Sequence, residues 1–126
     1  MSVWQGESGK KPTGGRIHLA RKKKKYELGG YPVYPTIGEE KRKTVKSKGG
    51  SEKVKLISLS YVNVLNQKNK TCKKAKILDV ITNPANPDLA RRKVITRGAI
   101  VNTELGKARI TSRPSQHGTA NAVLIE

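Results

Sequence analysis

Apolar residues in this chain concentrate in its second part, where their pattern predicts β-strands. Residues 54–65, VKLISLSYVNVL, are rich in β-branched and apolar residues, lack Pro and Gly, and predict one long strand. The apolar parity changes between Tyr61 and Val62, which predicts a bulge or bend near Ser60. A second strand is predicted over residues 72–82, because its strongest part, KILDVI, is apolar on both faces, as expected for a central or curved strand.

The sequence NPANPDLARRK, which follows, predicts a short helix. Asn86 can cap it, Pro87 suits the first helical position, and the negative charge of Asp88 complements the helix dipole. We expect one or two turns over residues 88–93. The remainder predicts strands and turns: strands at 99–101, 108–111 and 121–125, a turn at Leu105-Gly106 and another at residues 115–118.

Alternation along the strand predicted at residues 108–111 separates apolar from basic side chains. Ala108 and Ile110 should face one way, because successive side chains on a strand point to opposite sides. The opposite face is a basic strip: Lys107, Arg109, Thr111 and Arg113. Ordinary solvent exposure would also explain this strip. The charge of the whole chain makes contact with nucleic acid the preferred interpretation.

Residues 1–50 lack the apolar content needed for a core of their own. Tyr and Pro are frequent over residues 26–37 and predict an extended, partly packed segment. Residues 38–53, GEEKRKTVKSKGGSEK, hold Val45 as their single apolar residue and predict a solvated or RNA-facing loop. The sequence therefore predicts an N-terminal arm and loop over residues 1–50 and a β-rich body over residues 51–126.

Charge is the strongest signal for function. The chain has 27 Lys and Arg residues against 9 Asp and Glu residues, and its net charge is +18. The basic segment, residues 10–29, holds one acidic residue, Glu27, and eight basic ones: Lys10, Lys11, Arg16, Arg21, Lys22, Lys23, Lys24 and Lys25. Such a segment cannot bury itself, but it can lie against nucleic-acid phosphates.

Two features of the first sixteen residues have alternative interpretations. Thr13-Gly14-Gly15 lies between basic residues, where main-chain N–H groups can receive phosphate oxygens, or it is simply a flexible turn. It is not a P-loop, because the GxxxxGK[ST] spacing is absent. Trp4, the only Trp, either anchors the N-terminus in its own domain or stacks on a base.

Several function classes lose support. A transmembrane segment is not expected, because no apolar run approaches about 18 residues. A signal peptide is not expected either, because the start of the chain lacks the apolar core of one. Cys72 is alone and fits a reducing compartment, and with two histidines it is too sparse for a zinc site. A basic ribonuclease using His18 and His117 as base and acid would need both beside one phosphate, with a carboxylate to orient them. We therefore expect no catalytic residue, metal or cofactor.

The order of these segments resembles a known family. GKKPTGGR, RKKKKYELG, IGEEKRK, AKILDVITNPANPDLARR, GAIVNTELGKARITSRP and NAVLIE are similar to the S-eight-e family of small-subunit ribosomal proteins, found in archaea and eukaryotes. The resemblance covers nearly the whole chain, and the absence of a long internal insertion is typical of archaeal members. The chain departs from the pattern at Ser115, where Gly is usual, and in its lysine-rich HLARKKKK.

The resemblance implies an all-β fold: a small, antiparallel, β-barrel-like body with one short helix and a long basic N-terminal extension. It implies a cytoplasmic structural component of the small ribosomal subunit, a monomer there, with ribosomal RNA and neighbouring ribosomal proteins as partners and no membrane. A free RNA-binding module in translation or RNA modification is the alternative. The candidate RNA contacts are Trp4, Thr13, Gly14, Gly15, the eight cations of the basic segment, Lys41, Arg42, Lys43, Arg91, Arg92, Arg97, Lys107, Arg109 and Arg113.

Overall fold

The computed structural model describes residues 2–125 and divides them into two compact units, which meet in sequence between Pro32 and Val33. The first unit is mostly irregular and contains two short strands and one turn of 3-10 helix: β1 (Val3–Trp4), η1 (Lys25–Glu27) and β2 (Leu28–Gly29). The second unit contains β3 (Thr36–Ile37), β4 (Lys41–Lys46), β5 (Glu52–Leu59), β6 (Tyr61–Asn66), β7 (Thr71–Thr82), α1 (Pro87–Arg91), β8 (Ile100–Thr103), β9 (Gly106–Ile110), α2 (Pro114–His117) and β10 (Asn121–Leu124).

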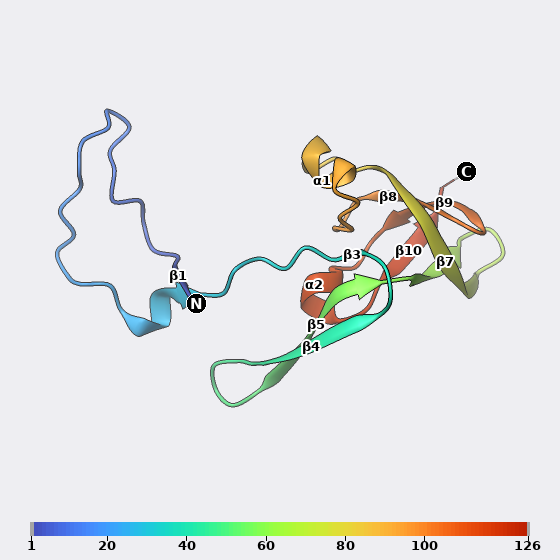
Figure 1. The fold of residues 1–126 in the computed structure, drawn as a ribbon, viewed down its shortest axis with the longest axis horizontal. Coiled ribbons are helices and arrows are strands. Elements are labelled where there is room, and N and C mark those ends of the chain that lie inside the picture. The colour runs from blue at the N-terminus through green and yellow to red at the C-terminus, as the bar shows by residue number, and fades with distance from the viewer. Residues whose placement is uncertain (1, 126) are drawn as a thin grey trace. The chain divides into compact units, whose positions relative to one another are not determined.

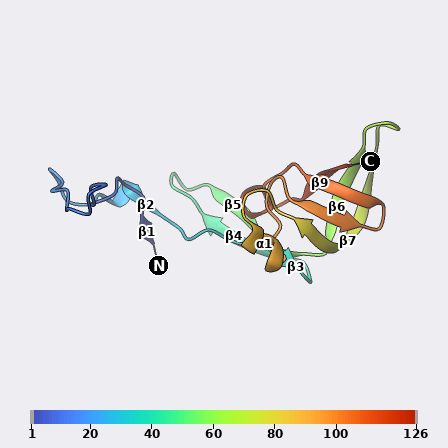
Figure 2. The same cartoon turned by 90° about the horizontal axis from the view of Figure 1, so that it is seen from above.

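Five strands of the second unit close into a barrel in the order β10-β6-β7-β8-β9 (Figures 1 and 2). Four of the five pairings are antiparallel, and the pairing of β10 with β6 is parallel. The barrel encloses small and β-branched side chains, among them Val62, Ile95, Val101 and Ile110, all almost completely buried. The predicted all-β class with a small barrel-like body is therefore confirmed.

The strand predicted over residues 54–65 is interrupted where the change of parity indicated. β5 ends at Leu59 and β6 begins at Tyr61, while the carbonyl of Ser60 accepts from the N–H of Ile77 at 2.8 Å. Leu59 is buried and Tyr61 is exposed. The bend at Ser60 thus allows one continuous stretch of chain to leave one sheet and enter the barrel.

The strand predicted over residues 72–82 is present as β7. Its pairing with β8 shifts register between Ile77 and Asp79, which is the signature of a bulge. The shift places both Ile77 and Val80 in the core, although they are three positions apart and would face opposite sides of a regular strand, and it turns Leu78 outward with 54 % of its surface exposed. The apolar residues on both faces of β7 therefore reflect a bulge.

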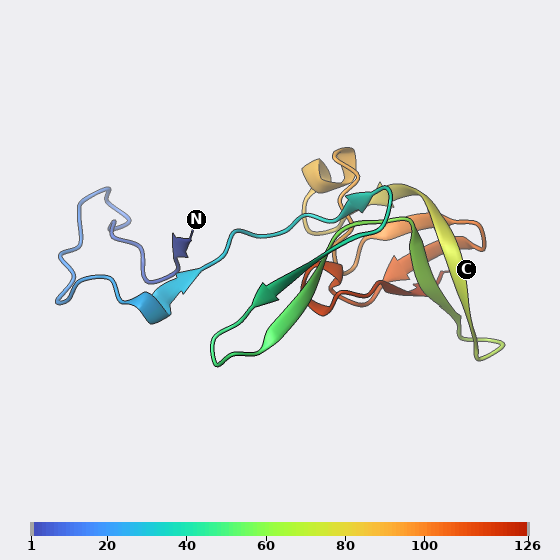
Figure 3. The ribbon, with the colours of Figure 1, turned by 60° about the horizontal axis from the view of Figure 1, so that its bottom comes forward.

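A loop was predicted over residues 38–53, and that prediction is wrong for residues 52–53, which begin β5, and for residues 41–46. These residues form β4, which pairs with β5 in a sheet of order β3-β5-β4; Figure 3 shows β4 and β5 as a long hairpin. Five of the six residues of β4 are exposed. Hydrogen bonds to β5 create this strand, and almost no apolar burial accompanies it, so the apolar pattern gave no signal.

The predicted helix is confirmed as α1. The side chain of Asn86 accepts from the N–H of Asp88 at 2.9 Å, as expected for an N-cap. The turn predicted at residues 115–118 needs correction, because its first part belongs to a second short helix, α2. Pro114 occupies the start of α2 and Gly118 ends it with φ near +71°, a conformation that Gly adopts without strain. The described residues thus hold two short helices where one was expected.

Candidate nucleic-acid interface

The basic segment lies inside a loop of the first unit that is closed at its base by β1 and β2. Val3 pairs with Gly29 and Trp4 with Leu28 in antiparallel register, and the N–H of Gln5 donates to the carbonyl of Glu27 at 2.9 Å. All eight cations of the segment are exposed. The unit therefore displays these charges to solvent from a loop whose two ends are held together.

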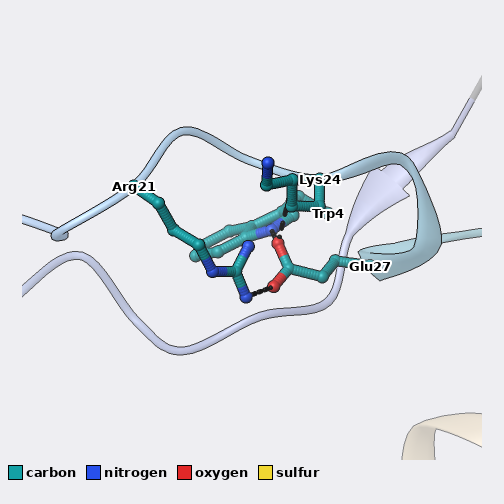
Figure 4. A network of polar contacts seen from close by, with 4 residues as sticks. All are labelled: Trp4, Arg21, Lys24 and Glu27. Carbon is teal, nitrogen blue, oxygen red and sulfur yellow. Dashed lines mark hydrogen bonds and ion pairs between the residues drawn. The ribbon is translucent and has the colours of Figure 1, made fainter.

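Glu27 organises the base of this loop (Figure 4). Its carboxylate accepts from the indole N–H of Trp4 at 2.7 Å, from the guanidinium of Arg21 at 2.5 Å and from the backbone N–H of Lys24 at 3.1 Å. These donors, Trp4 first, lower the pKa of Glu27 to about 2. Residues 4, 21, 24 and 27 are thereby joined by one ionised carboxylate.

Sequence reasoning left Glu27 out of the candidate site, although a signal was present. It is the only acidic residue among the twenty residues of the basic segment, so it had many potential cationic partners. Trp4, for which two interpretations were open, donates its indole N–H to Glu27, and the Lys23 ammonium lies 4.9 Å from the centre of its ring. Trp4 thus has an anchoring role within its own unit. Its contact with RNA stays a prediction.

The Gly-Gly motif forms a tight turn. The N–H of Gly14 donates to the carbonyl of Lys11 at 2.9 Å, and the N–H of Lys11 donates to Gly15 at 2.8 Å. Gly14 has φ near +87°, which explains the need for Gly there, and Lys10 and Arg16 form a bridge across the turn. The N–H groups of Lys11 and Gly14 are thus engaged within the turn and are not offered to a phosphate, whereas the basic side chains around the turn are exposed.

The second unit carries three further groups of predicted contacts: one on β4, one at and after the end of α1, and the basic strip of β9. In β4, Lys41 and Lys43 are exposed, and Arg42 pairs with Glu40 through an Nε–Oε1 hydrogen bond of 2.6 Å. At the end of α1, Arg91 pairs with Asp88 at 3.3 Å and Arg92 lies 5.6 Å from the centre of the Tyr34 ring; these residues and Arg97 are exposed. The three groups lie on different elements of this unit.

The basic strip on β9 has the predicted orientation. Lys107 and Arg109 are exposed, whereas Ala108 and Ile110 face the barrel core. Arg113, just before α2, is also exposed, and its guanidinium donates to the side chain of Gln116 at 3.3 Å. The strip therefore presents two exposed cations on a strand whose other face is fixed by core packing.

An aromatic and amide cluster on β6, β7 and β10 was missed. Tyr61 is exposed beside the ammonium of Lys74, which lies 4.7 Å from its ring centre. The side-chain amide of Asn63 donates to that of Asn121 at 3.1 Å. Sequence gives almost no signal for this cluster, because cross-strand register, and not proximity in the chain, brings its members together.

The two histidines belong to different units. His18 is exposed in the first unit, and His117 is exposed in α2, where its Nδ1 accepts from the N–H of Arg113 at 3.4 Å. No cluster of His, Cys, Asp and Glu suited to a metal ion occurs among residues 2–125. Within the same range, no helix has the length and apolarity to cross a membrane.

Comparisons with known proteins agree with one another. The family model described as ribosomal protein S8e matches residues 4–125. The curated relative from Methanoculleus marisnigri, named small ribosomal subunit protein eS8, is 49% identical over 122 residues, covering 97% of this chain and 98% of the relative. Proteins of the same name from Methanospirillum hungatei and Methanococcus vannielii are 50% and 49% identical, and each match covers at least 98% of both chains.

Proposed function

This chain belongs to the ribosomal protein S8e family, and from that premise we propose that it is a structural constituent of the small ribosomal subunit that binds ribosomal RNA. Its role there is architectural: it neutralises phosphate charge so that RNA segments can approach one another. It acts on the ribosome as a monomer, beside other ribosomal proteins, and its role requires no cofactor.

The observation that carries this proposal is the display of the basic segment. Eight cations are exposed on one loop, and the only carboxylate of that segment, Glu27, is used to close the loop. A cationic loop without a core of its own is suited to an irregular, densely charged partner. RNA is such a partner, because its backbone carries one negative charge per nucleotide.

The two units contribute different properties to RNA binding: the first mainly affinity, the second mainly selectivity for RNA shape. Exposed cations of the basic segment supply affinity that depends strongly on salt and weakly on RNA sequence. The basic strip of β9 and the cations at the end of α1 are held on elements packed into the second unit, so they lose less freedom on binding and favour one RNA shape. Recognition is mainly of backbone and shape, since Lys and Arg on phosphates carry no base information.

Fractionation of the ribosome tests the proposal. The full chain, tagged at its C-terminus and expressed in an archaeal host, should sediment with the small subunit and remain there through a high-salt wash. As a control, a tagged unrelated basic protein should wash off. Recovery of the chain mainly in the ribosome-free fraction would contradict a structural role and favour a free RNA-binding module.

A further inference from the structure

A pocket of about 160 Å³ opens on the outside of the second unit, next to the exposed Tyr61. Its apolar lining includes Leu59 and Ala120, which belong to the barrel core. Its polar lining includes Asn63, Lys74 and the ion pair between Arg42 and Glu40. The pocket therefore combines an apolar floor, an aromatic ring, an amide, the Lys74 ammonium and one ion pair within a volume suited to one nucleobase.

Tyr61 points outward from β6, and 47 % of its surface is exposed. In the antiparallel register its cross-strand partner is Lys76, and Lys74 lies one outward position further along β7, with its ammonium over the ring. Stacking of a base on an exposed aromatic ring is worth more than an exposed cation–π contact. A base can consequently displace the Lys74 ammonium from the ring, which leaves Lys74 and Lys76 beside the phosphate of the same nucleotide.

The amide pair provides groups for the edge of a base. Asn63 donates to Asn121 through one N–H, and these two side chains make no other side-chain hydrogen bond among the described residues. An amide acceptor on Asn63 and an amide donor on Asn121 therefore remain available side by side. Nucleobases present the same alternation of donor and acceptor on their edges.

We propose that this pocket binds a single unpaired nucleotide of RNA, with its base stacked on Tyr61 and its phosphate held by Lys74 and Lys76. The proposal rests on the RNA-binding function proposed above and adds a site that phosphate neutralisation does not require. A nucleotide within a double helix cannot enter, because both faces of its base are already stacked. A bulged or looped-out nucleotide can offer a free face.

The test compares two RNA duplexes that are identical except for one bulged 2-aminopurine nucleotide. The full chain should bind the bulged duplex about tenfold more tightly, in line with the contribution of one stacked base. The fluorescence of 2-aminopurine should fall on binding, because the base stacks on the phenol ring. Tyr61→Leu should abolish both the preference and the quenching, while Tyr61→Phe, which retains the ring, should preserve them.

Tyr34 provides a matched control. It is 44 % exposed and has a cation, Arg92, near its ring, but it lies outside this pocket. Tyr34→Leu should leave the preference for the bulged duplex unchanged. Equal binding of the two duplexes by the wild-type chain, or a preference that persists in Tyr61→Leu, overturns the proposal. If both duplexes bind equally, the pocket fails while RNA binding stands; if neither binds, the proposed function fails with it.

Discussion

Removal of two cations from the basic segment and of two from the β9 strip should weaken RNA binding in different ways. The first variant carries Lys22→Ala and Lys25→Ala, and the second carries Lys107→Ala and Arg109→Ala. All four side chains are exposed, and none of them takes part in an ion pair within the described residues. Each variant therefore loses the same charge without breaking an ion pair within the described residues.

The number of cations removed sets how far the salt dependence of binding should decrease in both variants. Each lost phosphate contact should reduce the slope of log K against log salt by about 0.7 to 0.9. The loss of two contacts should therefore reduce this slope by about 1.4 to 1.8. When the salt is raised from about 50 to 200 mM, the affinity of either variant should consequently fall by a factor about ten times smaller than the factor for the wild type. Equal flattening of the slope is expected, because the charge removed is equal.

Selectivity should separate the two variants. Lys22 and Lys25 lie on a loop without a core, so their loss should weaken binding to small-subunit ribosomal RNA and to random RNA alike. Lys107 and Arg109 lie on a strand anchored by Ala108 and Ile110, so their loss should also reduce the preference for ribosomal RNA. Salt titrations of both variants on both RNAs measure this. The proposal that the basic segment supplies affinity and the β9 strip supplies selectivity is refuted if the loop variant loses selectivity while the strand variant keeps it.

Three further expectations concern the free protein. Because the pKa of Glu27 is lowered from 4.5 to about 2, its bonds should stabilise the first unit above pH 4.5 and be lost as the pH falls through about 2. The fluorescence of Trp4 should report that transition, and Glu27→Gln should remove it. Residues 33–126 should melt cooperatively by circular dichroism, and residues 51–126 should melt at a lower temperature because β5 loses both neighbouring strands. Ile95→Ala should lower the free energy of unfolding in urea by about 2 to 5 kcal/mol, since Ile95 is 0% exposed; a loss below about 1 kcal/mol would contradict its place in the core.

Sequence reasoning succeeded where the physical cause is local. The bend at Ser60 follows from a change of apolar parity, and α1 begins at Asn86-Pro87 because capping groups act within one turn. The orientation of Lys107 and Arg109 follows from the two-residue period of a strand. Each of these features depends on residues only a few positions apart, so the pattern alone was sufficient.

The failures share the opposite cause. β4 exists because β5 offers it hydrogen bonds, and its own sequence, KRKTVK, contains one apolar residue. The parallel pairing of β10 with β6, which closes the barrel, brings Asn121 beside Asn63 across 58 residues of chain. The role of Glu27 likewise depends on a bond to Trp4, 23 residues away. Partners at such separations leave no periodic trace in the sequence.

The position of β4 has a consequence for the chain before it meets RNA. In the order β3-β5-β4 this strand forms an edge of its sheet, and an exposed edge is a template for pairing with another copy and for aggregation. Four of its six residues are the cations Lys41, Arg42, Lys43 and Lys46. Their mutual repulsion keeps two such edges apart. We therefore expect copies made in excess of the available RNA to resist self-association through charges that include three proposed RNA contacts, Lys41, Arg42 and Lys43.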